Sequence, residues 1–186
     1  VCLVERKGEV FGPRGNYIFN VGDKVHITAA NKNLKKFYKL LGNKDNLEKK
    51  ITSSLVIGGG KIAYYLVEFL QIANFYIKVI EIDKNKAISL SESFPDIDVI
   101  WADGSDRDTL IEEGIQAFDS CISLTGFDEE NIIINLYADK LGIKKTVAKV
   151  NRASLKQIAE DIGQYSYITP KEIVGNIITK YTKSLQ

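Results

Sequence analysis

The stretch SLVIGGGKIAYYLVEFL, from Ser54 to Leu70, contains the pattern that decides the fold. It passes from apolar, mostly branched residues through three glycines into a pattern of helical period. Within it, Gly58, Gly60 and Ala63 form G-x-G-x-x-A, a variant of the dinucleotide-binding fingerprint. This order predicts a strand, a tight glycine turn and the start of a helix.

Each small residue of the fingerprint has a physical reason. Gly58 permits the tight turn, Gly60 lets the backbone approach a pyrophosphate, and Ala63 lets helix and strand pack closely. The free N–H groups and the dipole of the helix start favour negative charge. Alone the motif is a weak signal, because glycine triplets occur in many turns.

Residues 53–169 alternate between strand and helix patterns. Strands are expected at Ser54–Ile57, Ile77–Ile82, Asp98–Trp101, Ser120–Leu124, Thr146–Val150 and Ser166–Ile168. Helices are expected at Ile62–Ile72, Lys84–Phe94, Arg107–Glu113, Glu129–Leu141 and Ser154–Ile162. Because parallel strands need crossover connections, the alternation predicts an α/β fold, a Rossmann-like doubly wound parallel sheet.

The segments on either side of this domain differ in character. Residues 1–42 read as short strands and tight turns closed by a helix that ends near Gly42, which predicts a small β-rich α+β partial domain. Residues 43–52 are polar and lysine-rich, as in a linker. A last helix is expected from Lys171 to about Lys183, with Pro170 in its first turn. Residues 170–186 would then lead out of the domain.

A carboxylate stands where the fold would use one. Glu81 lies near the end of the second expected strand, about 20 residues after the first glycine, where Rossmann domains bind the ribose hydroxyls. A carboxylate there would repel a 2′-phosphate, so NAD is favoured over NADP. The alternative is that Glu81 is a solvated strand end.

Two further loops follow strands at the same edge of the sheet. Asp103 to Asp106 could reach the adenine side of a ligand, or Ser105 or Asp106 could cap the next helix. Thr125-Gly126 follows the fourth strand, beside the switch in strand order where ligands bind. Asp128 is a candidate cap for the helix that follows it.

Composition excludes several classes of function. The net charge is +1 without long blocks of one sign, which argues against a nucleic-acid-binding face. No apolar run is long enough to span a bilayer, and no signal peptide is visible. The sequence contains no Met, which suggests a fragment. Cys2 and Cys121 lack the spacing of a metal site and are expected to be buried small hydrophobic residues.

Catalytic groups for a dehydrogenase are not evident. The one histidine, His26, lies in the separate β-rich segment. Tyr167 and Lys171 match the Tyr-x-x-x-Lys spacing of short-chain dehydrogenases, but Tyr167 reads as strand and Pro170 intervenes. We therefore expect a chain that binds a nucleotide without transforming it. The alternative is an NAD-dependent oxidoreductase fragment that lacks its catalytic domain.

Several motifs together resemble the RCK/KTN family of regulatory proteins that gate potassium channels and transporters. The segments are Val56–Ala63, Ile80–Lys84, Ala102–Asp106, Leu124–Asn131 and Ala148–Arg152. The most specific is Thr-Gly-x-Asp-Glu-x-Asn at Thr125–Asn131, which generic Rossmann enzymes lack. The resemblance spans residues 54–183, and residues 1–42 resemble the second half of that family's C-terminal domain.

The resemblance implies a non-enzymatic, cytoplasmic homo-oligomer, a dimer or ring, at the inner face of the cell membrane. It would bind NAD(H), or alternatively ATP/ADP, and gate the TrkH-like pore subunit of a potassium uptake system. By the same resemblance, Glu81 would hold the ribose and Lys149 could reach the phosphates. The other implied binding residues are Gly58, Gly59, Gly60, Lys61 and Ile62 around the phosphates, and Asp103, Thr125 and Gly126 along the nucleoside.

Two helices carry more apolar surface than one sheet face needs. The helix at Glu129–Leu141 is apolar around much of its circumference, which suggests a second buried contact and self-association. The last helix has an apolar stripe that we expect to cross to a neighbouring subunit. The stripe consists of Ile173, Val174, Ile177, Ile178 and Tyr181.

Overall fold

The computed structural model describes residues 2–41, 51–163 and 166–183. The chain divides into two compact units, Val1–Lys50 and Ile51–Gln186. Most of the linker expected at 43–52 lies outside the described residues, as does Gly42, the expected helix end.

The first unit is a three-stranded antiparallel sheet followed by a helix. The strand order is β2-β1-β3, and the elements are β1 (Leu3–Arg6), β2 (Glu9–Phe11), β3 (Lys24–His26) and α1 (Asn31–Leu40). Lys7 and Gly8 take positive φ, 52° and 84°, in the tight turn between β1 and β2. The Arg6 guanidinium donates to both oxygens of Asp23 at 2.7 Å and lowers the pKa of that carboxyl to about 2.

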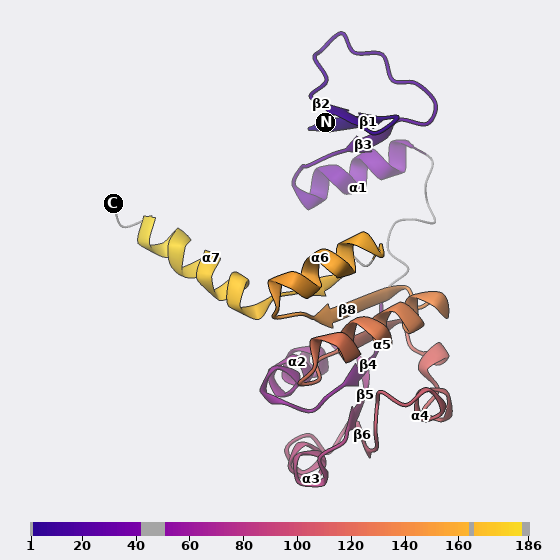
Figure 1. Cartoon of the computed structure of the whole chain (residues 1–186), viewed down its shortest axis with the longest axis vertical. Helices are drawn as coiled ribbons and strands as arrows, with labels where there is room; N and C mark the ends of the chain where they lie inside the picture. Colours follow the sequence, from indigo (N-terminus) through magenta and orange to yellow (C-terminus); the bar gives the residue numbers. More distant parts are fainter. Residues whose placement is uncertain (1, 42–50, 164–165, 184–186) are drawn as a thin grey trace. The chain divides into compact units, whose positions relative to one another are not determined.

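The second unit is a six-stranded parallel sheet in the order β6-β5-β4-β7-β8-β9, which confirms the predicted Rossmann-like fold (Figure 1). The strands are β4 (Ser53–Ile57), β5 (Tyr76–Glu81), β6 (Asp98–Trp101), β7 (Ser120–Ser123), β8 (Lys145–Lys149) and β9 (Tyr167–Ile168). The helices are α2 (Lys61–Ile72), α3 (Lys84–Ser93), α4 (Arg107–Glu112), α5 (Asp128–Lys140), α6 (Ala153–Asp161) and α7 (Pro170–Lys183), with a 3₁₀ turn η1 (Ile115–Ala117).

Alternating residues of β4 belong to two different cores. Val56 faces α2 and α3, where it clusters with residues such as Val67 and Leu90. Leu55 and Ile57 face the opposite side, where α4 and α5 cover the sheet (Figure 1). Because side chains alternate along a strand, the fully apolar run before the glycines buries both faces of this central strand.

Helix α5 is covered within its own unit. Ile134 and Ala138 join the core over β4 and β7, while Ile132 packs with β8 and α6. Ile133 remains 65% exposed. The chain's own sheet and α6 therefore account for most of the apolar circumference, and α5 gives no support to the predicted self-association.

The expected burial of Cys2 is wrong, and the expected contact of the last helix with a neighbouring subunit stays a prediction. Cys121 is fully buried, and burial raises the pKa of its thiol to about 12, but Cys2 is exposed. The reason is that the first unit, in its described part, buries Val4 but few other apolar side chains. On α7 no described residue is buried, and the apolar stripe is 47% to 66% exposed.

Over residues 2–41, 51–163 and 166–183, no helix has both the length and the apolar character that a membrane crossing requires.

Candidate functional site

A cavity of about 410 Å³ opens at the carboxyl ends of β4, β5 and β7. In the sheet β4 lies between β5 and β7. Successive strands are added on one side of β4 up to β6 and on its other side from β7 onward, and open α/β sheets bind ligands at such a switch point. Predicted residues that line the cavity are Gly58, Gly60, Glu81, Asp103, Thr125, Gly126 and Lys149. Gly59 instead lines an adjoining cavity, and Lys61 and Ile62 are exposed in the first turn of α2.

The glycine turn is fixed by a close approach to the loop after β7. Gly58 has φ +97°, and an added Cβ would lie 3.0 Å from the backbone carbonyl carbon and oxygen of Leu124. Gly60 has an ordinary φ of −73°, and an added Cβ would meet nothing within 4 Å. Gly60 also lines the cavity, so neither its φ nor its packing within the chain requires a glycine here.

The start of α2 offers donors to that space. Gly60 is the N-terminal cap residue, and no side chain caps this helix end. The first i to i−4 hydrogen bond of the helix runs from the Tyr64 N–H to the Gly60 carbonyl. The preceding N–H groups and the helix dipole are therefore suited to an anion.

Glu81 is buried, with 5% of its surface exposed, so the alternative of a solvated strand end is wrong. One carboxylate oxygen accepts the Gly59 N–H and the other accepts the Asp83 N–H at 2.8 Å. A carboxylate has about four lone-pair sites, so it can still accept hydroxyl groups from the cavity side.

The loop after β6 lines the cavity and also caps the next helix, while its expected contact with an adenine stays a prediction. Asp103 lines the cavity, and its Oδ1 accepts the N–H and the hydroxyl of Ser105 at 2.9 and 2.7 Å. Asp106 caps α4 by accepting the Thr109 N–H at 2.9 Å, which lowers the pKa of this carboxyl.

Gly104 lines the cavity, and the sequence placed it in the loop Asp103 to Asp106 without predicting a role of its own. An added Cβ would lie 2.5 Å from Cγ2 of Ile57, so the loop presses its backbone onto β4. Only a residue without a side chain permits this approach. The available signal was a glycine three residues after the expected strand end at Trp101.

A second missed residue, Asn131, joins two walls of the cavity. It is fully buried on α5. Its Oδ1 accepts the Thr125 N–H at 2.9 Å, and its Nδ2 donates to the Lys149 carbonyl at 2.9 Å and the Thr125 carbonyl at 3.3 Å. Asn131 thus fixes the loop after β7 against the end of β8. The sequence showed Asn131 in a family-like motif but gave it no role.

Asp128 does not cap its own helix, contrary to expectation. It is 4% exposed and accepts the N–H groups of Asn151 and Arg152, both at 2.8 Å. Arg152 is the N-terminal cap residue of α6, so Asp128 serves the next helix. Burial alone would raise the pKa of Asp128, but these hydrogen bonds outweigh it and the pKa is lowered.

Two lysines line the cavity from opposite sides. The Lys149 ammonium donates to the Leu124 carbonyl at 3.3 Å, beside the glycine turn. Lys86 reaches the cavity from the first turn of α3 and was not predicted. Carboxylates of Glu81, Asp103 and Glu130 line the same space. The cavity thus has both hydroxyl-binding and phosphate-binding groups.

The histidine and the tyrosine–lysine pair considered for the oxidoreductase alternative lie outside the cavity lining. His26 is in the first unit, and Tyr167 is in β9, where its hydroxyl donates to Glu160 and its pKa is raised to about 12. Lys171 follows Pro170 on α7, so it does not share a helix with Tyr167. In the described ranges, no group of three or more His, Cys, Asp and Glu side chains could hold a metal ion.

Comparison with known proteins identifies the family. The model of the TrkA-N domain matches residues 54–170, more than half of the chain. The chain belongs to the TrkA-N domain family. This match confirms the resemblance to regulatory RCK/KTN proteins that the motifs predicted.

Two curated relatives of the TrkA-N chain are Trk system potassium uptake proteins. That of Haemophilus influenzae is 33% identical over 152 residues, which cover 82% of this chain and 32% of the relative. A homologue from Methanosarcina mazei is 27% identical over 183 residues, covering 98% of this chain and 44% of the relative. The chain therefore spans less than half the length of these relatives.

Solved structures establish the same fold. The TrkA-N domain of the inner membrane protein ybaL of Escherichia coli has a TM-score of 0.62 at 12% identity, covering 72% of this chain and 98% of that one. The GsuK RCK domain has a TM-score of 0.59 at 18% identity, covering 96% and 37%. The AMP-bound C-terminal domain of Kef from Shewanella denitrificans has a TM-score of 0.55 at 14% identity, covering 72% and 81%.

Proposed function

We propose that this chain is a nucleotide-binding regulatory module of a membrane potassium uptake system. The observation that carries the proposal is the cavity at the ends of β4, β5 and β7, where a glycine turn, an uncapped helix start and Glu81 meet. The curated relatives, named as Trk system potassium uptake proteins, supply the physiological context. The module is a cytoplasmic homo-oligomer, a dimer or ring, that docks on a TrkH-like pore subunit at the membrane.

The ligand is NAD(H), or alternatively ATP or ADP. Its phosphates lie at the turn Gly58–Ile62, within reach of Lys149, and its ribose hydroxyls bind Glu81. Its nucleoside extends along Asp103 and along Thr125-Gly126. The AMP-bound Kef domain, which shares the fold, supports an adenine nucleotide.

The ligand acts as a signal and is not consumed. The cavity lining in the described part of the chain contains no histidine, tyrosine or cysteine, and its titratable side chains are carboxylates and lysines. Hydride transfer needs a group that gives or takes a proton beside the reacting carbon. The cavity instead presents hydrogen-bond donors and charges suited to holding a nucleotide.

Titration calorimetry with NADH, NAD, ATP and ADP tests the proposal. We expect saturable binding of at least one of these ligands at one site per chain. Trp101, the only tryptophan of the sequence, gives a second readout. Its indole N–H donates at 3.0 Å to the carbonyl of Ile82, and Ile82 lines the cavity. Ligand binding should change its fluorescence.

Turnover separates the proposal from an oxidoreductase fragment. NADH incubated with the protein and a panel of carbonyl compounds should keep its absorbance constant. Steady NADH oxidation that disappears in the Gly60→Val variant would favour the oxidoreductase instead. No binding of any of the four nucleotides at millimolar concentration would refute the proposed function.

A further inference from the structure

The net charge of +1 conceals an opposite charge on each of the two units. Residues 1–50 carry eleven lysines and arginines against five aspartates and glutamates, a net charge of +6. Residues 51–186 carry fourteen against nineteen, a net charge of −5. Such asymmetry within one chain is typical of a basic part that binds an acidic partner, so the first unit is suited to one.

Most of the excess positive charge of the first unit lies on α1. This helix, NKNLKKFYKL, contains four lysines and no acidic residue. Lys32, Lys36 and Lys39 follow one another at spacings of four and three residues, so they lie on one side of the helix. All three are exposed, and together they form the lysine face of α1.

The stability of the helix does not explain these lysines. Like charges one turn apart destabilise a helix, and Lys32 lies in the first turn, where the helix dipole disfavours a cation. In the described part of the first unit, Arg6 pairs with Asp23. The other ion pair there joins Lys24 to Glu5, so neither pair neutralises α1.

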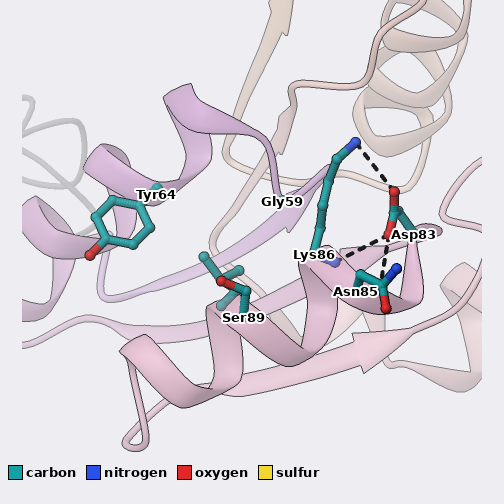
Figure 2. A pocket seen from close by; sticks show the side chains of 7 residues that line it. Gly59, Tyr64, Asp83, Asn85, Lys86 and Ser89 are labelled. Atoms are coloured by element: carbon teal, nitrogen blue, oxygen red, sulfur yellow. Dashed lines mark hydrogen bonds and ion pairs between the residues drawn. The ribbon is translucent and has the colours of Figure 1, made fainter.

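Several lysines of the second unit, in contrast, have carboxylate partners. The Lys86 ammonium lies 3.7 Å from Asp83 on the first turn of α3 (Figure 2). Lys78 pairs with Glu113 at 2.9 Å. The lysine face therefore differs from these lysines in that no ion pair with a described residue offsets its charge.

An exposed leucine borders the lysine face. Leu40 is 85% exposed and follows Lys36 by four residues, so it lies one turn further along on the same side of α1. Leu41, which ends the helix, is 58% exposed. A membrane with anionic lipids attracts the ammonium groups and also accepts apolar side chains below its headgroups. A purely polar polyanion would gain nothing from the leucines.

We propose that the lysine face of α1, together with Leu40, is a docking surface for a membrane that contains anionic phospholipids. The ammonium groups bind the acidic headgroups, and Leu40 enters the boundary between headgroups and acyl chains. This contact with lipid is separate from the pore subunit named under the proposed function. It rests on that function only for its membrane setting and needs neither the nucleotide cavity nor α7.

Sedimentation of the full chain with lipid vesicles tests the proposal. We expect the wild-type protein to bind vesicles of phosphatidylcholine mixed with phosphatidylglycerol but not vesicles of phosphatidylcholine alone. Binding should weaken steeply between about 0.05 and 0.5 M salt, because salt screens exposed charges. Lys36→Glu combined with Lys39→Glu should lower the partition constant at least about tenfold, since each cation contributes to attraction at an anionic surface.

A matched control changes the charge of the same unit equally. Lys7→Glu combined with Arg14→Glu alters two exposed side chains outside α1 and should keep binding within about threefold of wild type. Leu40→Ser should lower vesicle binding about fivefold but leave binding to double-stranded DNA unchanged. Thermal unfolding and NADH titration of each variant check that the fold and the nucleotide site persist.

Every result decides for or against the docking surface. Equal binding to both kinds of vesicle, no binding to either, or an equal loss in the control pair overturns it. Binding to DNA that is tighter than to vesicles, with vesicle binding indifferent to Leu40→Ser, assigns α1 to nucleic acid and overturns it too. Self-association that Lys36→Glu with Lys39→Glu abolishes, without vesicle binding, assigns α1 to a second copy instead. NADH binding by a wild-type protein that ignores lipid leaves the proposed function intact.

Discussion

The N–H of Gly59 donates a hydrogen bond to the carboxylate of Glu81, which joins the glycine turn to the end of β5. The residue proposed to bind the ribose is thereby positioned by the turn proposed to bind the phosphates. An added Cβ at Gly59 would lie 3.2 Å from Cβ and Oε2 of Glu81, so the Glu81 side chain would have to shift to admit it. A hydrogen bond and a close contact therefore link the two proposed halves of the site.

Replacing Glu81 should weaken nucleotide binding. Glu81→Ala removes the acceptor for the ribose hydroxyls and for the N–H groups of Gly59 and Asp83. We expect a loss of about 1.5–3 kcal/mol in binding free energy for NADH and ADP, measured by calorimetry, with some loss of thermal stability. Glu113→Ala is the control, because Glu113 pairs with Lys78 at 2.9 Å and does not line the cavity. Unchanged dissociation constants in Glu81→Ala would remove Glu81 from the site.

Replacing Gly58 should instead damage the fold. An alanine there would keep the strained φ of +97° and press its Cβ on the Leu124 carbonyl. We expect Gly58→Ala to lower the free energy of unfolding by about 1–3 kcal/mol in denaturant titrations. Gly126→Ala, whose Cβ would meet nothing within 4 Å, should be nearly neutral. Equal stability of the two variants would show that the turn relaxes freely.

The parts of the structure set by local pattern were predictable from the sequence. The G-x-G-x-x-A turn, the strand and helix periods and Pro170 at the start of α7 depend on neighbouring residues. The parallel sheet then followed from the need for crossover connections. Glu81 could be placed because the number of residues between the glycine motif and the end of the second strand varies little in this fold.

The missed residues depend on contacts between distant segments. Residue 104 must be glycine because it packs against Ile57, and Asn131 donates a hydrogen bond to the Lys149 carbonyl. The number of residues between the partners of each contact follows no characteristic sequence pattern. Asp128 was assigned to the nearest helix start, but the sheet brings it to the start of α6. Lys86 reaches the cavity because α3 begins directly after β5, and solvated lysines occur on most helices.

Two buried asparagines on α5 separate binding from stability. Asn131 and Asn135 are both fully buried, but Asn135 accepts from the Ser123 hydroxyl at 2.9 Å, away from the cavity lining. Each alanine variant removes buried hydrogen bonds and packed volume and should lose about 1–3 kcal/mol of stability. Only Asn131→Ala should also raise the dissociation constant of NADH or ADP, when both variants are compared well below their unfolding temperatures. If Asn135→Ala weakens binding equally, Asn131 has no specific role in the cavity.

The exposed stripe of α7 should mediate assembly. Ile177 is 63% exposed in the middle of the stripe, and burial of such a side chain against a second subunit would be favourable. Ile177→Asp should therefore lower the oligomer mass measured by light scattering, while circular dichroism and nucleotide binding persist. Asn176→Asp adds the same charge beside the stripe and should keep the wild-type mass. A full-size oligomer of Ile177→Asp would contradict assembly through α7.

The most direct test of the nucleotide site is a calorimetric titration of Gly60→Val against wild type with NADH and ADP. Gly60 lines the cavity with an ordinary φ, and an added Cβ would meet nothing within 4 Å. The valine should therefore cost little stability beyond a weaker helix cap, and its side chain should obstruct a bound pyrophosphate. We predict a loss of binding of at least about tenfold in a protein that remains folded. Wild-type affinity in Gly60→Val would contradict the account, because the nucleotide would then bind somewhere other than this cavity.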